Sequence, residues 1–589
     1  MEQEFATSIS EACPQSRSSV QNLLDYLALR KHDLRDLQFR LAALGFSSLG
    51  RSESCTLAAI DAVIAILERL AGKRRTHDSA STQLAFKKGT ATLARNAHRL
   101  LGPLPQGRAV RIMVTLPSEA ADSYEMVKAL IADGTDLVRI NCAHDSQMEW
   151  QSMITHVHNA NQESGKHCKV LMDLAGPKLR TGTIRRGCEV ARWRVVRDVR
   201  GNVIVPARIC LVGKNATPNS LPKFDAQLPV PNKLLHHIDL ADTIEIMDSR
   251  NKIRKLTVIS KADHACLCTC SQGAYVLSGS KLSVLRKGKE IAKGHLSELP
   301  FVEEPIHLQP GDLLVLTRQE ESVAAAHRHL PHISCTLPEV FSTALPGQPI
   351  FFDDGKIEGQ ISEVDPEYIL VEIFHTGAAA AKLGSAKGIN LPETGFSIGA
   401  LTGKDREDLD FVAANADIVG LSFVRRAEDV QALQQELAAR GESNLGIVLK
   451  IESRPGFEQL PLIMMAALRH HPVGIMVARG DLTIEVGFER LAEVQEEILW
   501  LSEAAHMPVI WATQVLETLT KTGIPSRAEV TDAAMGVRAE CVMLNKGEHI
   551  LDAVRFLDGI LHRMRAHHLK KRSMLRRLRV AQIKYEAAP

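Results

Sequence analysis

The segment VLMDLAGPKLRTG (residues 170–182) marks the point where the pattern of the sequence changes. It begins as a buried strand and ends at Gly176-Pro177, which stops the strand because proline has no amide hydrogen to donate. One carboxylate, Asp173, and two cations, Lys178 and Arg180, flank this stop. Taken alone, the segment is typical of a solvent-exposed turn with a salt bridge. The flanking sequence is needed to predict whether it belongs to a functional site.

Short apolar runs alternate with amphipathic helices on both sides of this segment. The runs before and within it are IMVTL (112–116), DLVRIN (136–141) and KVLMD (169–173), separated by predicted helices at 119–132 and 146–163. Five more follow: DIVGLSF (417–423), GIVLKIE (446–452), VGIMVA (473–478), PVIWA (508–512) and CVMLN (541–545). Strands that alternate with helices indicate a parallel sheet, and eight such units predict an α/β fold, the (β/α)₈ TIM barrel.

The remaining sequence predicts three further parts. Residues 183–345 are rich in Val, Thr, Gly and Pro with short strand-like runs, which indicates a β-barrel-like domain inserted after the third barrel strand. Residues 1–107 have helical periodicity only and predict a helical N-terminal extension. The barrel then comprises 108–182 and 346–563, and 564–589 form a basic C-terminal tail or helix.

Composition narrows the class of protein. The net charge of +2 gives no global electrostatic argument for nucleic acid or membrane partners. No apolar run approaches the roughly 20 residues that span a bilayer, and the first residues do not resemble a signal peptide, so a cytoplasmic location is predicted. Eleven scattered cysteines indicate reduced thiols, and Cys266, Cys268 and Cys270 are expected to line one strand face rather than to bind zinc.

Charged side chains stand at the predicted strand ends, where the chemistry of a barrel is located. Lys450 and Glu452 alternate along one strand, so both point to the same side. Glu452 and Asp481 follow adjacent strands and are predicted to hold a hard divalent cation such as Mg²⁺. Arg139 and Lys450 would surround an anion bound to that metal. The alternative is that these charged residues form ordinary structural ion pairs and bind no ligand.

Eight motifs, in order, resemble those of pyruvate kinases over roughly residues 110–563. They are RINCAHD (139–145), MDLAGPKLRTG (172–182), FFDDG (351–355), AKGINLP (386–392), LSFVR (421–425), LKIES (449–453), GIMVARGDLTIE (474–485) and WATQVLETL (511–519), the last followed by PSRAEVTDAA (525–534). The resemblance also implies a mobile lid domain at the position of the predicted insertion.

The resemblance implies roles for individual residues. Arg139 and Lys450 would hold the phosphoryl group of phosphoenolpyruvate, and Glu452 and Asp481 would bind Mg²⁺ or Mn²⁺. Thr513 would position the water chain that protonates the enolate. Two groups of contacts complete the implied site. Gly480, Asp481 and Thr513 would contact the substrate, and Asn141, His144, Arg180 and Lys387 would contact the phosphates of ADP or ATP. Phosphoryl transfer needs such positioning and charge neutralisation more than covalent chemistry.

The sequence departs from the family pattern at a few positions. Only 26 residues follow Arg563, so the sugar-phosphate-binding C-terminal domain is expected to be absent. Asn545 and Lys546 stand where the family usually has Ser-Gly-Glu-Thr.

Many members of the family need K⁺, and the positions matching their K⁺ ligands are Asn141, Ala143, Asp173 and Leu174. Ala143 and Leu174 offer no side-chain oxygen, and Lys178 replaces a glutamate. The ammonium of Lys178 is therefore predicted to replace the ion, so that K⁺ is not required.

Two other functions stay open from the sequence. One is a Mg²⁺-dependent lyase that acts on pyruvate-like substrates in the same barrel superfamily, and the other is a catalytically silent metabolite-binding protein. The predicted partners are phosphoenolpyruvate and ADP or ATP, without nucleic acid or membrane. A homodimer through the barrel is left open.

Overall fold

The computed structural model describes residues 6–47, 49–73, 79–184, 186–213, 224–262, 264–319, 327, 329–377, 379–395, 398–565, 567–569 and 572–573. The chain forms two compact units. The barrel unit comprises Met1–Arg180, Thr336–His375 and Gly388–Pro589, and the β unit comprises Thr181–Cys335 and Thr376–Lys387.

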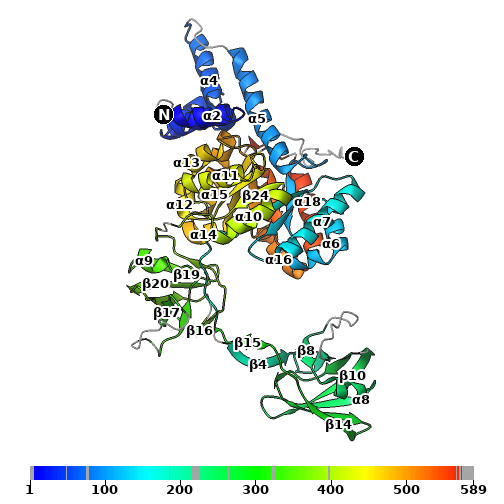
Figure 1. The fold of residues 1–589 in the computed structure, drawn as a ribbon. Helices are drawn as coiled ribbons and strands as arrows, with labels where there is room; N and C mark the ends of the chain where they lie inside the picture. The colour runs from blue at the N-terminus through cyan, green and yellow to red at the C-terminus, as the bar shows by residue number, and fades with distance from the viewer. Residues whose placement is uncertain are drawn as a thin grey trace, which may run out of the picture. The chain divides into compact units, whose positions relative to one another are not determined.

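Eight parallel strands close into a barrel, as the sequence predicts (Figure 1). The strands are β1 (Arg111–Thr115), β2 (Leu137–Asn141), β3 (Lys169–Asp173), β24 (Ile418–Leu421), β25 (Gly446–Ile451), β26 (Val473–Ala478), β27 (Val509–Ala512) and β28 (Cys541–Leu544). Most of their residues are buried, which is why each appears in the sequence as a nearly continuous apolar run. The inserted segment leaves the barrel after β3, and the chain returns at β24, which confirms the predicted fold class.

Helices cover the outside of the barrel. The main ones are α6 (Tyr124–Ala132), α7 (Gln147–Ser164), α10 (Gly403–Asn415), α11 (Ala427–Ala439), α13 (Leu460–Ala467), α15 (Leu491–Ala504), α17 (Arg527–Met535) and α18 (Ile550–Met564). Capping boxes fix where several of them begin: Ser146 with Glu149 starts α7, and Thr402 with Asp405 starts α10. The apolar faces of these helices and the outward side chains of the strands form one continuous core.

The N-terminal extension is helical, and its last helix enters the barrel core. It contains α1 (Ala6–Glu11), α2 (Arg17–Arg30), α3 (Arg35–Ala43), α4 (Thr56–Leu70) and α5 (Ser79–Leu101). Leu100 and Leu101 at the end of α5 belong to the same apolar cluster as the inward residues of the strands, such as Val448 and Met476. In the barrel unit α5 therefore closes one end of the barrel (Figure 1).

The β unit is built around a seven-stranded sheet, ordered β14-β13-β9-β10-β11-β7-β8. These strands are β14 (Lys289–His295), β13 (Lys281–Arg286), β9 (Thr243–Met247), β10 (Ile253–Ala262), β11 (Ala265–Cys270), β7 (Ala207–Val212) and β8 (Ala226–Pro229). All its pairs are antiparallel except β7 with β8. Within the described residues, β14 and β8 are the two edge strands of this sheet. Cys266, Cys268 and Cys270 lie buried in the apolar cluster of this sheet, as free thiols.

Residues 346–563 are predicted to belong to the barrel domain. In the structure β19 (Pro349–Phe352), β20 (Ile357–Val364) and β21 (Tyr368–His375) lie in the barrel unit but form antiparallel pairs outside the eight-stranded barrel. Residues 376–387 group with the β unit. An apolar run such as IFF does not reveal in which direction its partner strand will run, and the domain limits themselves stay a prediction.

Two remaining predictions concern the chain end and membranes. The basic tail predicted at 564–589 lies mostly outside the described residues, from 574 onward. Among the described residues, no helix combines the length and the apolar character needed to cross a membrane.

Candidate active site

The carboxyl ends of the barrel strands gather charged side chains at one end of the barrel. Arg139 and Asn141 are on β2, Asp173 ends β3, and Lys450 is on β25. The strand register sets Asn141 beside Asp173, and Asp173 beside Gly420 of β24. The sequence therefore predicts correctly that these positions meet at strand ends.

Asp173 is a buried carboxylate held by two cations. Its Oδ2 accepts hydrogen bonds from Arg139 Nε at 2.8 Å and Nη2 at 2.5 Å, and lies 3.0 Å from Lys450 Nζ. Burial acts to raise the pKa of Asp173, but the charges of Lys450 and Arg139 outweigh it and lower this pKa. Gly420 makes room for the carboxylate, since a Cβ there would lie 2.6 Å from Asp173 Oδ1.

Lys450 is the centre of the cluster. Its Nζ donates to Ser422 Oγ at 2.7 Å and lies 2.9 Å from Glu452 Oε1. Burial acts to lower the pKa of Lys450, and the adjacent carboxylates of Asp173 and Glu452 raise it, so the side chain is an ammonium fixed in the interior. The sequence analysis does not single out Ser422. Its position directly after β24, in LSFVR, is the signal that could have identified it.

Two carboxylates lie within electrostatic range of each other at this end of the barrel. Burial raises the pKa of Glu452, and the negative charge of Asp481 adds to this increase. Lys450 neutralises Glu452, and Lys178 Nζ donates to both carboxylate oxygens of Asp481 at 2.8 and 3.0 Å. Two neighbouring carboxylates that require cations are a donor set that fits Mg²⁺, which takes few protein ligands and fills the rest of its sphere with water and substrate oxygens.

Gly480 and Thr513 are joined by a hydrogen bond. The Gly480 amide, at the start of α14 (Arg479–Val486), donates to Thr513 Oγ1 at 2.8 Å. Thr513 has a φ of 61°, a conformation that is unfavourable for a β-branched residue and needs support from its surroundings. Arg479 supplies that support because its Nη2 donates to the Thr513 carbonyl at 2.6 Å.

Arg479 is a second residue whose role the sequence analysis misses. Its Nε donates to the Ala512 carbonyl at 3.0 Å, its Nη1 pairs with Asp532, and its guanidinium lies over the Trp511 ring. These partners lie in the motifs WATQV and TDAA, which are far from Arg479 in the sequence. No sequence pattern indicates that they contact this arginine.

The residues predicted to bind nucleotide phosphates fall into two groups. Asn141, His144 and Arg180 are in the barrel unit. Partial burial, followed by the positive charges of Lys546 and Arg180, lowers the pKa of His144, which shows that these groups share one region. Lys387 belongs to the β unit, where its amide donates to Thr181 Oγ1 at 2.8 Å.

The family model described as "Pyruvate kinase, barrel domain" matches residues 107–217 and 234–550. The chain belongs to the pyruvate kinase family. The matched segments contain all eight barrel strands together with Arg139, Lys450, Glu452 and Asp481, whereas the helices α1 to α5 lie before them.

Several curated pyruvate kinases are similar to part of the chain. The pyruvate kinase of Clostridium acetobutylicum is 30% identical over 281 residues, which are 46% of this chain and 56% of that protein. Pyruvate kinase 2 of Candida glabrata is 33% identical over 276 residues, covering 46% and 51%. Pyruvate kinase 1 of Saccharomyces cerevisiae is 34% identical over 277 residues, covering 46% and 52%. The chain spans about half the length of the curated pyruvate kinases it matches.

Proposed function

We propose that this protein transfers the phosphoryl group of phosphoenolpyruvate to ADP, giving pyruvate and ATP, and acts in glycolysis in the cytoplasm. The observation that carries the proposal is the buried ammonium of Lys450, held between Asp173 at 3.0 Å and Glu452 at 2.9 Å. A positive charge fixed by its surroundings needs no reorganisation when negative charge moves between substrates. Membership of the pyruvate kinase family supports the same activity.

Arg139 and Lys450 are the cations proposed to hold the phosphoryl group. Arg139 uses Nε and Nη2 to bind Asp173, and its Nη1 donates to Thr115 Oγ1 at 3.3 Å, so the guanidinium has a fixed orientation. Glu452 and Asp481 would hold a divalent cation, Mg²⁺ or Mn²⁺, which when bound supplies further neutralisation of charge on phosphoryl and enolate oxygens. Asp173 has a positioning role, since it orients both cations.

Transfer breaks the bond between the enol oxygen and phosphorus and forms a bond from phosphorus to a β-phosphate oxygen of ADP. The enolate that remains takes a proton at its methylene carbon to become pyruvate. Thr513 is proposed to position the water that delivers this proton, and its hydroxyl is already oriented by the Gly480 amide. Gly480 is proposed to contact the substrate carboxylate, where the start of α14 favours a negative group.

The nucleotide phosphates are proposed to bind Asn141, His144, Arg180 and Lys387. His144 lies in the positive field of Arg180 and Lys546, which favours an anion on that side of the site. We also propose that the activity does not require K⁺ and that the protein binds neither nucleic acid nor membranes. A homodimer that forms through the barrel is compatible with this proposal.

A coupled assay with phosphoenolpyruvate, ADP and Mg²⁺ tests the proposal, using Lys450→Met as the decisive variant. We expect pyruvate formation by the unaltered protein, and a loss of kcat on the order of 10³ or more in the variant, because the fixed charge is removed. Lys128→Met, which replaces an exposed lysine on α6, is the matched control and should keep near-normal activity.

Thermal unfolding of Lys450→Met shows whether the fold survives, since the substitution leaves two buried carboxylates short of a partner. Near-normal kcat in a folded Lys450→Met protein would contradict the assignment. So would an unaltered protein that forms no pyruvate from phosphoenolpyruvate and ADP.

A further inference from the structure

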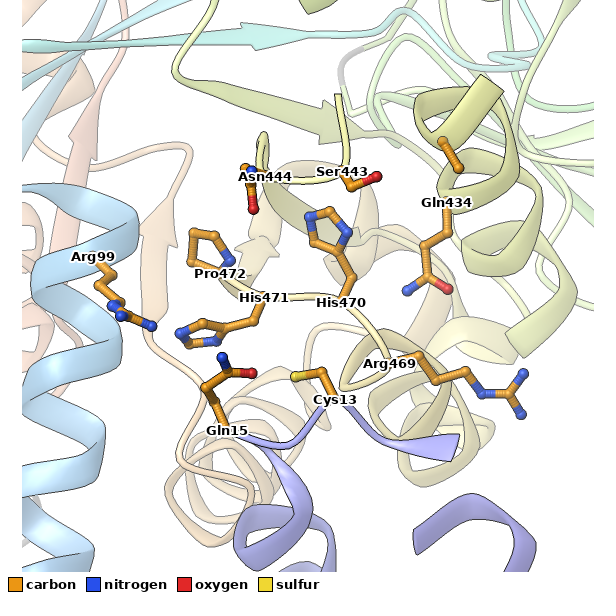
Figure 2. Close-up of a pocket in the computed structure, with 11 residues that line it drawn as sticks. Cys13, Gln15, Arg99, Gln434, Ser443, Asn444, Arg469, His470, His471 and Pro472 are labelled. Carbon is orange, nitrogen blue, oxygen red and sulfur yellow. The ribbon is translucent and has the colours of Figure 1, made fainter. Parts of the chain in front are cut away.

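A cavity of about 710 Å³ lies at the opposite end of the barrel from Lys450 (Figure 2). Its walls come from the loops that precede β25 and β26, from α11, and from the N-terminal extension. The side chains that matter for its chemistry are Gln15, Arg99, Gln434, Asn444, His470 and His471. The volume is in the range of pockets that bind small metabolites.

The walls of this cavity are fixed by contacts between the extension and the barrel. The Cys13 amide donates to the Leu468 carbonyl at 3.1 Å, and Arg469 pairs with Glu11. Gln434 Nε2 donates to the Ala466 carbonyl at 3.0 Å. In Figure 2 the Arg469 guanidinium points away from the middle of the cavity, so its charge is used by Glu11 and not by the cavity.

Arg99 and His471 face each other across one side of the cavity (Figure 2). The Nε2 atom of His471 is buried and has no hydrogen-bond partner among the described residues. Within the described part of the chain the Arg99 guanidinium, which reaches the cavity, forms no ion pair with a carboxylate. A buried ring nitrogen without a hydrogen-bond partner is costly unless a ligand supplies one, and the solvent-exposed Arg99 side chain offers a positive charge to the same ligand.

The electrostatics of His471 agree with this geometry. Burial, followed by the positive charges of Arg99, His470 and Arg95, lowers the pKa of His471 to about 4. No carboxylate contributes to this shift, and Glu11, the acidic residue nearby in the extension, is paired with Arg469. His470 is held by its own hydrogen bond to the Leu445 carbonyl at 2.7 Å. The region around His471 is therefore positive, with nothing in the described chain to balance it.

We propose that this cavity binds a small phosphorylated metabolite, with the phosphate between Arg99 and His471. Without a ligand the His471 ring is neutral, because its pKa is about 4. A phosphate dianion balances the Arg99 guanidinium and has a second negative charge that favours uptake of a proton by the His471 ring, whereas the single charge of a carboxylate is already balanced by Arg99. The Gln15 amide points toward His471 in Figure 2 and provides a further donor. Gln434 and Asn444 line the remaining volume, where the rest of the metabolite would lie.

The test is calorimetric titration of the full-length protein with AMP and, separately, with sulfate as a phosphate analogue. We expect both probes to bind at concentrations below about 10 mM. Arg99→Glu should weaken binding at least tenfold, because it places a carboxylate where the anion sits. Arg95→Glu, one turn earlier on α5, is the matched control for long-range charge and should change the dissociation constant less than threefold.

The pH dependence of sulfate binding provides a second readout that a merely structural role of His471 would not affect. Sulfate stays a dianion between pH 8 and 6, so a binding constant that rises as pH falls reports proton uptake by the protein. The charged groups that affect His471 are Arg99 and Arg95 from α5 and His470 from its own loop, while Arg469 of the same loop points away and pairs with Glu11. We expect this rise in the unaltered protein and its loss in His471→Gln.

Three results would overturn the proposal. The first is an absence of binding for both probes at about 10 mM. The second is AMP binding that Arg99→Glu leaves unchanged, which would place AMP at the nucleotide subsite of the active site. The third is an equal weakening of ligand binding by Arg95→Glu and Arg99→Glu, which would mean that binding depends on the overall positive charge of α5 and not on a contact with Arg99. Because the cavity is at the far end of the barrel, none of these results bears on the proposed phosphoryl transfer.

Discussion

Lys178 binds Asp481 through both carboxylate oxygens, at 2.8 and 3.0 Å. Its ammonium also lies 5.8 Å from the centre of the Phe423 ring. A tethered cation at this position supplies positive charge without the entropy loss of binding a free ion. A mobile monovalent cation nearby would be repelled, and Ala143 and Leu174 have no side-chain oxygen with which to hold it. We therefore propose that the charge of Lys178, which lies on a proposed metal ligand, substitutes for a monovalent cation.

We predict that activity does not depend on K⁺. Initial rates without sodium or potassium should match those in ~0.1 M KCl, when a bulky organic cation keeps the ionic strength equal. Lys178→Glu should lower activity, because it places a carboxylate beside Asp481, and added K⁺ should not restore it. A several-fold stimulation of the unaltered protein that is specific to K⁺ would show that Lys178 does not replace the ion.

Glu485 provides a pH-dependent contribution to stability. Burial raises its pKa to about 7, although the carboxylate accepts hydrogen bonds from Asn390 Nδ2 at 3.0 Å and from the Arg454 backbone amide. The folded state therefore binds a proton more tightly than the unfolded chain does. Stability from this proton is fully present below the ordinary glutamate pKa and is lost as pH rises through about 7.

We predict that Glu485→Gln stabilises the protein at pH 8 but not at pH 4.5. The gain in unfolding free energy at pH 8 should reach about 3 kcal/mol, since the pKa is raised from 4.5 to about 7 and each pKa unit is worth about 1.4 kcal/mol. Urea unfolding at both pH values measures it. Equal effects of the substitution at the two pH values would mean that Glu485 is already ionised in the folded protein at low pH.

At the level of secondary structure, α14 and β27 are joined by one side chain. Arg479 begins α14 and donates to the carbonyls of Ala512 and Thr513, where β27 ends. Its third contact, with Asp532, reaches α17. A single guanidinium thus fixes the start of one helix, the end of one strand and the unusual backbone of Thr513.

We predict that Arg479→Lys lowers kcat by about tenfold or more, although it keeps the positive charge. Lysine cannot direct hydrogen bonds to three partners in the plane of a guanidinium, so Thr513 would lose its support. The KM for phosphoenolpyruvate should change less than kcat, because the substrate contacts proposed for Arg139 would remain. The matched control is Arg527→Lys, at the start of α17. A larger effect on KM than on kcat would argue against a role through Thr513.

The barrel strands were predictable because buried parallel strands appear as short, nearly continuous apolar runs, and IMVTL or GIVLKIE have that form. The gathering of Arg139, Lys450 and Glu452 followed from their places at strand ends. The contact between Lys178 and Asp481 was not predictable, since it depends on how two loops approach in space. The antiparallel pairing of the strands at 349–375 was not predictable either, because the direction of pairing depends on the neighbouring strand and is not encoded in the apolar run itself.

For the molecule as a whole, the helical extension is part of the barrel core. Leu100 is 1% exposed, and its side chain lies against the backbone of two strands. A Cβ on Gly446 or Gly474 would come within 2.8 or 2.6 Å of it, so both glycines leave room for this leucine. The extension also forms one wall of the cavity that contains Arg99 and His471. Stability, and the ligand site proposed there, therefore both depend on α5.

We predict that Leu100→Ala lowers the unfolding free energy by about 2–5 kcal/mol, because it removes buried surface and leaves a void that the barrel strands cannot close. Leu70→Ala, in the same extension but at a side chain 70% exposed, is the matched control and should cost less than about 0.5 kcal/mol. Urea unfolding of the full-length protein measures both. If α5 were only an appendage, Leu100→Ala would cost no more than Leu70→Ala. A large difference would instead mean that the barrel depends on α5 for its stability. The strands β25 and β26 have glycines, Gly446 and Gly474, at the end of the barrel where they begin, and the side chain of Leu100 fills the space beside them.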